Sequence, residues 1–138
     1  MKNKRGFTAG AFDMFHIGHL NLLKNAKEYC DYLIVGVNTD ELIQQYKDKY
    51  TIIPFAERIA IVDSIKYVDE TMRIESLDKE INWQINNYDY LFIGSDWKGS
   101  ERWNKTEKIM AKHGVEVIYL PYTDTTNSTV IREKLMNF

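Results

Sequence analysis

The chain has 138 residues, a length that fits one domain with a single sizeable hydrophobic core. Apolar residues make up 44% of the sequence and charged residues 28%, which is ordinary for a globular protein. The formal net charge of -2 excludes a general affinity for nucleic acid or for an anionic membrane, so a phosphate-binding site has to be a local basic cluster.

Short apolar runs alternate with longer segments of helical periodicity, a pattern typical of a parallel α/β sheet. The first part of the chain predicts a strand over 5–11, a helix that carries Leu20, Leu23 and Ala26 at helical spacing, and a buried strand over 32–37. Thr39 and the two acids after it mark the start of the next helix. Pro54 suits the first turn of a helix over 55–65.

The second half repeats this alternation. It predicts strands over 67–72, 90–94 and 115–120, and helices over 77–86, 101–112 and 128–136, with Gly114 as a stop signal. Together the elements predict one Rossmann-like, doubly wound domain over 1–138, built on a mainly parallel five-stranded sheet. Folds of this kind bind ligands at the carboxyl ends of their strands.

Cysteine content and hydropathy favour a cytoplasmic protein. The single cysteine, Cys30, cannot form an internal disulfide, which fits a reducing compartment. The basic start of the chain runs into Gly6-Phe7-Thr8 without a long apolar segment, so we expect neither a signal peptide nor a membrane span.

The segment between the first strand and its helix carries the most specific motif, Gly10-Ala11-Phe12-Asp13-Met14-Phe15-His16-Ile17-Gly18-His19. Gly10 permits a close backbone approach at the turn, and Gly18 lets a phosphate lie near the first amides of the helix. His16 and His19 can both donate to phosphate oxygens, which suits the charge of a transferring phosphoryl group. The alternative is that His16 packs in the loop and His19 caps the helix.

Basic residues follow in the middle of the chain. Lys47 and Lys49 lie in an irregular stretch, where they could close over a triphosphate or form part of a solvated surface. Arg58, one turn into the next predicted helix, could hold an anionic substrate with its bidentate fork. Alternatively, it pairs with Glu57 or Asp63 or lies on a solvated face.

Two further polar segments come after later strands. In the segment 94–103, Asp96 can accept a hydrogen bond from an amine or a ribose hydroxyl, Trp97 offers a flat face, and Trp103 is expected to anchor the following helix. Before the last helix, Ser128 or Thr129 is either an N-cap or part of a phosphate cradle, and the two readings are compatible.

In this order, the motifs resemble the bacterial glycerol-3-phosphate cytidylyltransferases, within a wider nucleotidyltransferase superfamily marked by the paired histidines. The resemblance implies a Rossmann-like homodimer that needs a divalent metal, usually Mg²⁺. It runs from about Phe7 to Arg132 and rests on Gly10-Ala11-Phe12-Asp13, His16-Ile17-Gly18-His19, Lys47, Lys49, Arg58, Gly94 to Trp97, and Ser128-Thr129.

The resemblance also implies a reaction and residue roles. The phosphate of a small phosphorylated alcohol attacks the α-phosphorus of CTP and expels pyrophosphate, without a covalent enzyme intermediate. His16 and His19 stabilise the transition state, Lys47 and Lys49 hold phosphates of CTP and of the substrate, and Arg58 holds the phosphate side of the site. Lys47 and Arg58 are thereby implied to be catalytic as well as substrate-binding. The remaining nucleotide contacts that it implies are Gly10, Ala11, Phe12, Asp13, Gly18, Gly94, Asp96, Trp97, Ser128 and Thr129.

The chain departs from the family pattern at several of these positions. Ala11 stands where the family usually has threonine, Tyr122 replaces a phosphate-binding arginine, and Asp124 keeps an acid. Arg132 is a candidate to replace the lost charge, or it points to solvent and pairs with Glu133. These departures affect the choice of both base and acceptor.

The leading hypothesis is a CTP:glycerol-3-phosphate cytidylyltransferase that makes CDP-glycerol for a cell-wall or capsular polymer. The alternatives are a cytidylyltransferase for phosphoethanolamine, phosphocholine or another phospho-alcohol, an adenylyltransferase that uses ATP, and a nucleotide-binding module without turnover. The intact pair His16 and His19 argues against the last of these.

Overall fold

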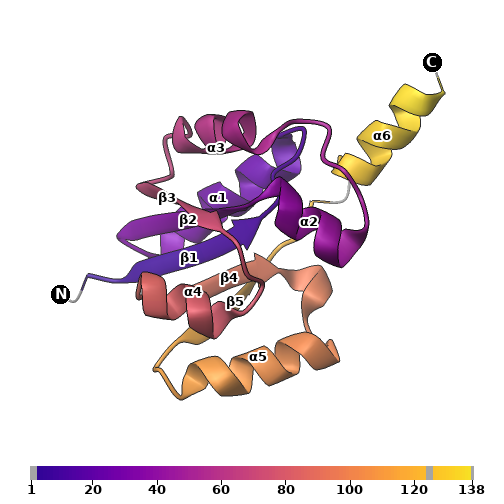
Figure 1. The fold of residues 1–138 in the computed structure, drawn as a ribbon. Helices are drawn as coiled ribbons and strands as arrows, with labels where there is room; N and C mark the ends of the chain where they lie inside the picture. The colour runs from indigo at the N-terminus through magenta and orange to yellow at the C-terminus, as the bar shows by residue number, and fades with distance from the viewer. Residues whose placement is uncertain (1–2, 124–125, 138) are drawn as a thin grey trace.

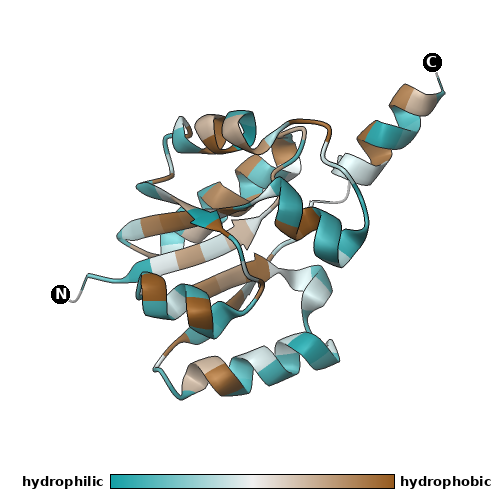
Figure 2. Ribbon diagram, viewed as in Figure 1, coloured by the Kyte–Doolittle hydropathy of each residue, from teal (hydrophilic) through white to brown (hydrophobic). Residues whose placement is uncertain are grey.

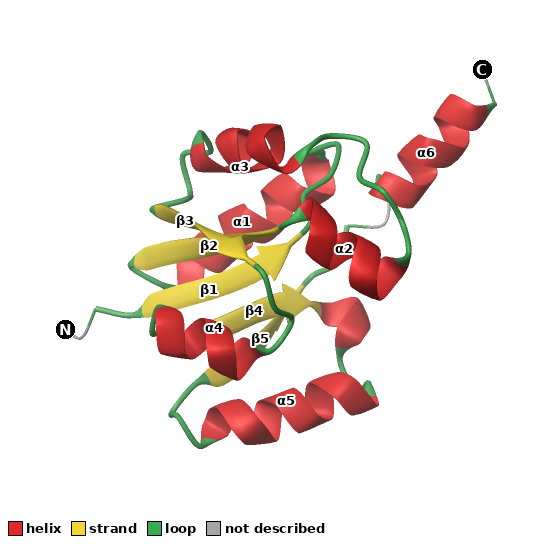
Figure 3. Cartoon of the chain, viewed as in Figure 1, coloured by secondary structure: helices red, strands yellow, loops and turns green. Residues whose placement is uncertain are grey.

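The computed structural model describes residues 3–123 and 126–137 and is built around one five-stranded sheet (Figure 1). All strands run parallel, in the order β3-β2-β1-β4-β5 (Figure 3). Strand β1 lies in the middle, with Phe7 beside Ile34 and Leu91. The strands are β1 (Arg5–Gly10), β2 (Tyr32–Asn38), β3 (Glu70–Ile74), β4 (Tyr90–Gly94) and β5 (Glu116–Leu120).

Helices cover both faces of this sheet, as a doubly wound fold requires. They are α1 (Ile17–Tyr29), α2 (Asp40–Lys47), α3 (Phe55–Asp63), α4 (Lys79–Ile85), α5 (Glu101–Ala111) and α6 (Ser128–Met136), with a 3-10 turn η1 (Ser95–Trp97). One core lies between the sheet and α1 and α3, and contains Leu23, Leu33 and Val62. The other lies under α2, α4 and α5, and contains Ile34 and Met110.

The alternation of side chains along the strands produces these two cores. Leu33, Val35 and Val37 of β2 face one core, whereas Ile34 faces the other, and all four are fully buried. In Figure 2 hydrophobic residues are prominent along β2 and β4 and recur on the covering helices. Helix α6 extends away from the sheet (Figure 1).

The predicted fold class is confirmed, and the predicted elements are present with shifted ends. The strand expected over 67–72 is β3, Glu70–Ile74, because the chain first makes a turn in which the Val68 amide donates to the Ile65 carbonyl. The helix expected over 77–86 begins only at Lys79, because Asp78 caps it by accepting from the amides of Glu80 and Ile81.

Candidate active site

The loop between β1 and α1 presents the two histidines of the site. Phe12 and Met14 adopt left-handed backbone conformations, with φ of 52° and 51°. Phe12 is nevertheless held firmly, because its ring is buried and packs against the ring of His19 at a centroid distance of 5.2 Å. The core therefore fixes a strained loop in one shape at the carboxyl end of β1.

Hydrogen bonds to both histidines fix their tautomers. His16 Nδ1 accepts from the Gly18 amide at 3.1 Å, and His19 Nδ1 accepts from the His16 amide at 3.3 Å. A neutral imidazole that accepts through Nδ1 carries its proton on Nε2. The two rings stack with centroids 3.8 Å apart, so each offers one Nε2–H donor for a ligand.

The two histidines were expected either to donate to phosphate or to pack in the loop and cap the helix, and this arrangement is compatible with both. His16 is the N-cap of α1, and His19 completes a capping box, yet both side chains also line a cleft. Gly18 is required here, because a Cβ at this position would lie 2.9 Å from His16 Cε1 and 3.2 Å from the carbonyl oxygen of Thr126.

Burial keeps both imidazoles neutral. Burial, helped by the neighbouring His16, lowers the pKa of His19 to about 3, whereas Asp13 opposes the shift. Burial also lowers the pKa of His16. The histidines are therefore neutral hydrogen-bond donors at physiological pH rather than cations.

The lowered pKa of His19 predicts a loss of stability in acid. Between the unfolded value near 6.5 and about 3, the unfolded chain binds more protons at this site than the folded one. The free energy of unfolding should therefore fall as the pH drops below 6.5, with a contribution from His19 of up to about 1.4 kcal/mol per pH unit. Urea unfolding of wild type and His19→Asn at pH 7 and pH 5 measures this, and equal losses in both proteins would contradict it.

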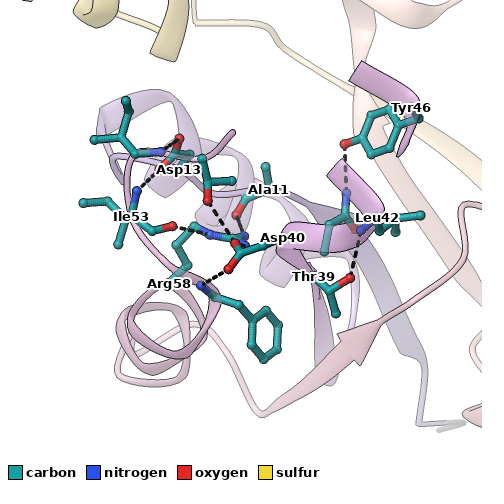
Figure 4. Close-up of polar contacts among 12 residues, drawn as sticks. Ala11, Asp13, Thr39, Asp40, Leu42, Tyr46, Ile53 and Arg58 are labelled. Atoms are coloured by element: carbon teal, nitrogen blue, oxygen red, sulfur yellow. Dashed lines mark hydrogen bonds and ion pairs between the residues drawn. The ribbon is translucent and has the colours of Figure 1, made fainter. Parts of the chain in front are cut away.

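Asp13 connects three segments of the site. Its buried carboxylate accepts from the amides of Ile52 and Ile53 at 2.8 and 2.9 Å (Figure 4). It also accepts from Arg132 Nη2 at 2.7 Å. Its backbone carbonyl accepts from Ser128 Oγ at 2.9 Å. The histidine loop, the segment before α3 and the start of α6 are thus held together.

The site contains two clefts, and the first, of about 240 Å³, lies beside Asp13 and is lined by several cationic side chains. Lys47, Lys49 and Arg132 line it together with His19, Ser128 and Thr129. Burial, Lys49 and Arg132 all lower the pKa of Lys47. An anion in this cleft would relieve the repulsion among the three cations.

The position of Lys47 differs from the expected irregular stretch. It is the last residue of α2, which ends at Asp48 in a left-handed C-cap with a φ of 52°. Lys49 follows in the loop, so the two lysines reach the same cleft from a fixed helix end and from a connecting segment.

A second cleft of about 340 Å³ adjoins the first, and the two share His19, Lys47 and Ser128. Gly94, Asp96 and Trp97 line it, as do His16, Gly18, Tyr122 and Asn127. A Cβ at Gly94 would lie 2.6 Å from Asp96 Oδ1, so glycine allows the carboxylate to fold back over the end of β4. Trp97 and Tyr122 are 44% and 51% exposed, which leaves two aromatic faces open to a ligand.

Most of the predicted site residues come together around these two clefts. They include Gly10, Ala11, Phe12, Asp13, His16, Gly18, His19, Lys47, Lys49, Gly94, Asp96, Trp97, Ser128 and Thr129. Trp103 is buried, as expected of a helix anchor. The N-cap of α6 is Asn127 rather than Ser128 or Thr129, because its side chain accepts from the Val130 amide.

Arg58 lines neither of the two clefts. Its side chain is fully buried and donates to the carbonyls of Ala11 and Ile53 and to Asp40 Oδ1, at 2.5, 2.8 and 2.6 Å (Figure 4). The expected contact of Arg58 with a substrate phosphate is thus absent from this arrangement. The pairings suggested with Glu57 or Asp63 are not formed either, because the guanidinium turns inward to the start of α2.

Arg132 faces the first cleft and pairs with Asp13, rather than with Glu133 or solvent alone. Its Nε is buried without a hydrogen-bond partner among the described residues. Asp124, the acid noted in the sequence, lies outside the described residues. No sequence pattern singled out Asn38, Tyr46, Lys79 or Arg102, which line a third cavity beside the two clefts.

Comparison with known proteins shows the family to which the chain belongs. The sequence pattern of a family described as Cytidylyltransferase-like matches residues 7–134. The chain belongs to the cytidylyltransferase-like family. The resemblance inferred from the motifs is thereby confirmed, and the protein is a nucleotidyltransferase.

Several proteins with different names are similar to this chain over most of its length. A glycerol-3-phosphate cytidylyltransferase of Bacillus spizizenii is 38% identical, covering 96% of this chain and 97% of that protein. An FAD synthase of Thermococcus kodakarensis is 35% identical over 88% of this chain and 82% of its own length. In structure, a lipopolysaccharide core biosynthesis protein of Thermoplasma volcanium superposes with a TM-score of 0.78 at 26% identity, over 89% of this chain and 100% of that one.

Proposed function

We propose that this nucleotidyltransferase transfers CMP from CTP to a small phosphorylated alcohol, glycerol 3-phosphate, and releases CDP-glycerol and pyrophosphate. The observation that carries this proposal is the pair of neutral imidazoles whose Nε2–H donors share adjoining clefts with Lys47, Lys49 and Arg132. The full-length likeness to glycerol-3-phosphate cytidylyltransferases supports the choice of acceptor.

In this reaction a phosphate oxygen of the acceptor forms a bond to the α-phosphorus of CTP. The bond from that phosphorus to the bridging oxygen of the β-phosphate breaks, and pyrophosphate leaves with the electron pair. Negative charge spreads over the phosphoryl oxygens during the transfer. His16 and His19 donate hydrogen bonds to these oxygens, and the lysines and Arg132 hold the triphosphate and the acceptor phosphate.

The second cleft suits the nucleoside. Trp97 and Tyr122 offer aromatic faces to a base, and Asp96 can accept from an exocyclic amine or a ribose hydroxyl. Ser128 and Thr129, at the start of α6, lie where the triphosphate would pass between the two clefts.

We propose that Mg²⁺ reaches the site with the triphosphate. Among the described residues no group of three His, Cys, Asp or Glu side chains could hold a metal ion. The carboxylate of Asp13 is occupied by two amides and Arg132, so phosphate oxygens would supply most of the ligands. When bound, the metal would neutralise charge on the phosphates.

The protein is further proposed to act as a cytoplasmic homodimer that supplies CDP-glycerol for a cell-wall or capsular polymer. None of the helices in the described part of the chain is long and apolar enough to cross a membrane. The resemblance supports the dimer, and light scattering of the purified protein tests it.

A second candidate function is the same nucleotidyl transfer with ATP as the nucleotide or with another phospho-alcohol as the acceptor. The likeness to an FAD synthase favours testing ATP, and Ala11 and Tyr122 are departures at positions expected near the nucleotide. Pyrophosphate release should be assayed with each nucleoside triphosphate against glycerol 3-phosphate, phosphoethanolamine and phosphocholine. Turnover confined to CTP with glycerol 3-phosphate supports the proposal. Thermal stabilisation by a nucleotide without any turnover would instead indicate a binding module.

Lys47 and Lys49 should act on substrate binding. We expect Lys47→Ala and Lys49→Ala each to raise KM for CTP or for the acceptor by about tenfold, because each removes a charged donor from the cleft. The kcat should fall as well if the contact tightens in the transition state. Lys24→Ala, an exposed lysine on α1, is the control. Steady-state constants equal to wild type in both cleft variants would make the pair ordinary surface charges.

Arg132 should bind the nucleotide in place of the arginine that Tyr122 replaces. Its guanidinium lies in the cleft with Lys47 and Ser128, so Arg132→Ala should weaken CTP binding by about 1.5–3 kcal/mol, the range for a charged hydrogen bond. Titration calorimetry measures this, with exposed Lys134→Ala on the same helix as the control. Wild-type affinity in Arg132→Ala would refute the role. Tighter binding in Tyr122→Arg would then show that the site had given up a charge.

A further inference from the structure

A third cavity, of about 450 Å³, lies at the strand ends on the side of the sheet covered by α2, α4 and α5. Gly10, Ala11 and Lys47 line both this cavity and the first cleft. Ile93 and Trp97 line both this cavity and the second cleft. The cavity therefore adjoins both clefts, and neither His16 nor His19 lines it.

An incompletely paired amide stands in its wall. Asn38, at the end of β2, is 95% buried, since only 5% of its surface is exposed. Its Nδ2 donates to the hydroxyl of Tyr46 at 3.2 Å, whereas its Oδ1 is buried without a hydrogen-bond partner among the described residues. Rotating the amide by half a turn would exchange the two atoms and again leave one unpaired.

A ligand hydroxyl would complete this pairing. A buried amide oxygen without a donor carries a free-energy cost that a hydrogen bond removes. A hydroxyl can donate to Asn38 Oδ1, or accept from the amide nitrogen in its rotated form. The phenol of Tyr46, which accepts from Asn38, also keeps its own proton available for a second hydroxyl.

The charge of the cavity restricts the ligand further. Its described lining includes Lys47, Lys79 and Arg102, and no aspartate or glutamate. Neither Lys79 nor Arg102 forms an ion pair with any residue in the described ranges 3–123 and 126–137. Burial and the charge of Arg102 lower the pKa of Lys79 to about 8. Such a lining favours a phosphate ester with a neutral chain and disfavours an alkylammonium group.

We propose that this cavity receives the carbon chain of the phosphorylated alcohol, and that Asn38, with Tyr46 behind it, selects acceptors that carry a free hydroxyl. This assignment rests on the proposed transfer of CMP and names the acceptor class as a phosphorylated polyol. Asn38 and Tyr46 are specificity-determining residues in this scheme, and Lys79 and Arg102 exclude phosphoethanolamine and phosphocholine by repulsion.

The test compares glycerol 3-phosphate with propyl phosphate, which lacks both hydroxyls. With saturating CTP, wild type should prefer glycerol 3-phosphate in kcat/KM by about 100-fold or more, because a site built for a hydroxyl rejects an analogue without one. Asn38→Ala should lower kcat/KM for glycerol 3-phosphate by about 10- to 100-fold and leave that for propyl phosphate within about threefold. KM for CTP should not change. Tyr46→Phe should shift the preference in the same direction by a smaller factor.

Two exposed positions supply matched controls, Asn87→Ala for the amide and Tyr29→Phe for the phenol, and both should keep the wild-type preference. If Asn38→Ala does not fold, Asn38→Ser and Tyr46→Phe carry the test. Equal losses for the two acceptors would overturn the assignment, as would efficient use of phosphoethanolamine by wild type. Lack of turnover with every nucleotide would overturn the proposed function itself, whereas turnover without a hydroxyl preference overturns only this inference.

Discussion

Replacing either His16 or His19 by alanine should lower kcat by about 100-fold or more, which is the loss measured when one preorganised donor to a developing negative charge is removed. The reason is geometric: the Nδ1 atoms of both rings accept from backbone amides, so each ring keeps its Nε2–H as the donor, and both rings line the second cleft. Steady-state pyrophosphate release measures the effect.

Two additional observations separate catalysis from folding. Because the histidines form the capping box of α1, each alanine variant also removes a cap, with an expected cost of about 1 kcal/mol in unfolding free energy. His16→Asn retains a side-chain acceptor for the Gly18 amide without the imidazole donor. It should therefore recover stability but not activity. Activity within about threefold of wild type in a histidine variant would remove that residue from the mechanism.

The neutrality of the pair has a kinetic consequence that sequence alone could not supply. A histidine in a phosphate site is readily imagined as a cation, but burial lowers the pKa of both side chains. The Phe12 ring against His19 contributes to that burial, and its place depends on a left-handed turn that no local pattern announces. Rates should therefore not rise as the pH falls through 6.5, as they would if a protonated imidazole were required.

The order of elements was predictable because strand and helix periodicity follow directly from burial. The continuous, β-branched run from Leu33 to Val37 predicted a strand covered on both faces, and the Thr39 cap and Pro54 marked helix starts that the structure confirms. Boundaries near Asp69 and Asp78 were missed because side-chain hydrogen bonds set them: Asp69 accepts from the Leu33 amide across the sheet, and Asp78 caps α4.

The site residues likewise include some whose place was predictable from the sequence and some whose place was not. Residues adjacent in sequence to a strand end, such as Gly10 and Gly94, could be placed at the sheet edge from topology alone. The direction of a basic side chain could not be predicted. Contacts with residues far along the chain decide whether such a side chain faces a cleft or the interior. Arg132 reaches Asp13, which lies 119 positions before it, and Arg58 turns away from the clefts altogether.

Arg58 should be required for stability rather than for contact with substrate. Its fully buried guanidinium joins Ala11 of the histidine loop, Ile53 before α3 and Asp40 at the start of α2 (Figure 4). Arg58→Ala leaves three acceptors without their donor, so we expect the free energy of unfolding to fall by about 3–5 kcal/mol, the range for breaking a buried pair. Urea unfolding at pH 7 measures this loss.

A matched surface pair separates burial from charge in this prediction. Arg73 pairs with Glu75 at 2.8 Å, but both side chains are more than half exposed, so Arg73→Ala should cost no more than about 1 kcal/mol. Activity of Arg58→Ala should fall as well, because the carbonyl of Ala11 that Arg58 holds belongs to the loop that presents His16 and His19. Stabilising the variant with an excess of CTP should recover part of that activity, since ligand binding favours the folded loop. If Arg58→Ala instead lost activity at wild-type stability, the side chain would have to leave its buried position and bind phosphate, as its place in the sequence first indicated.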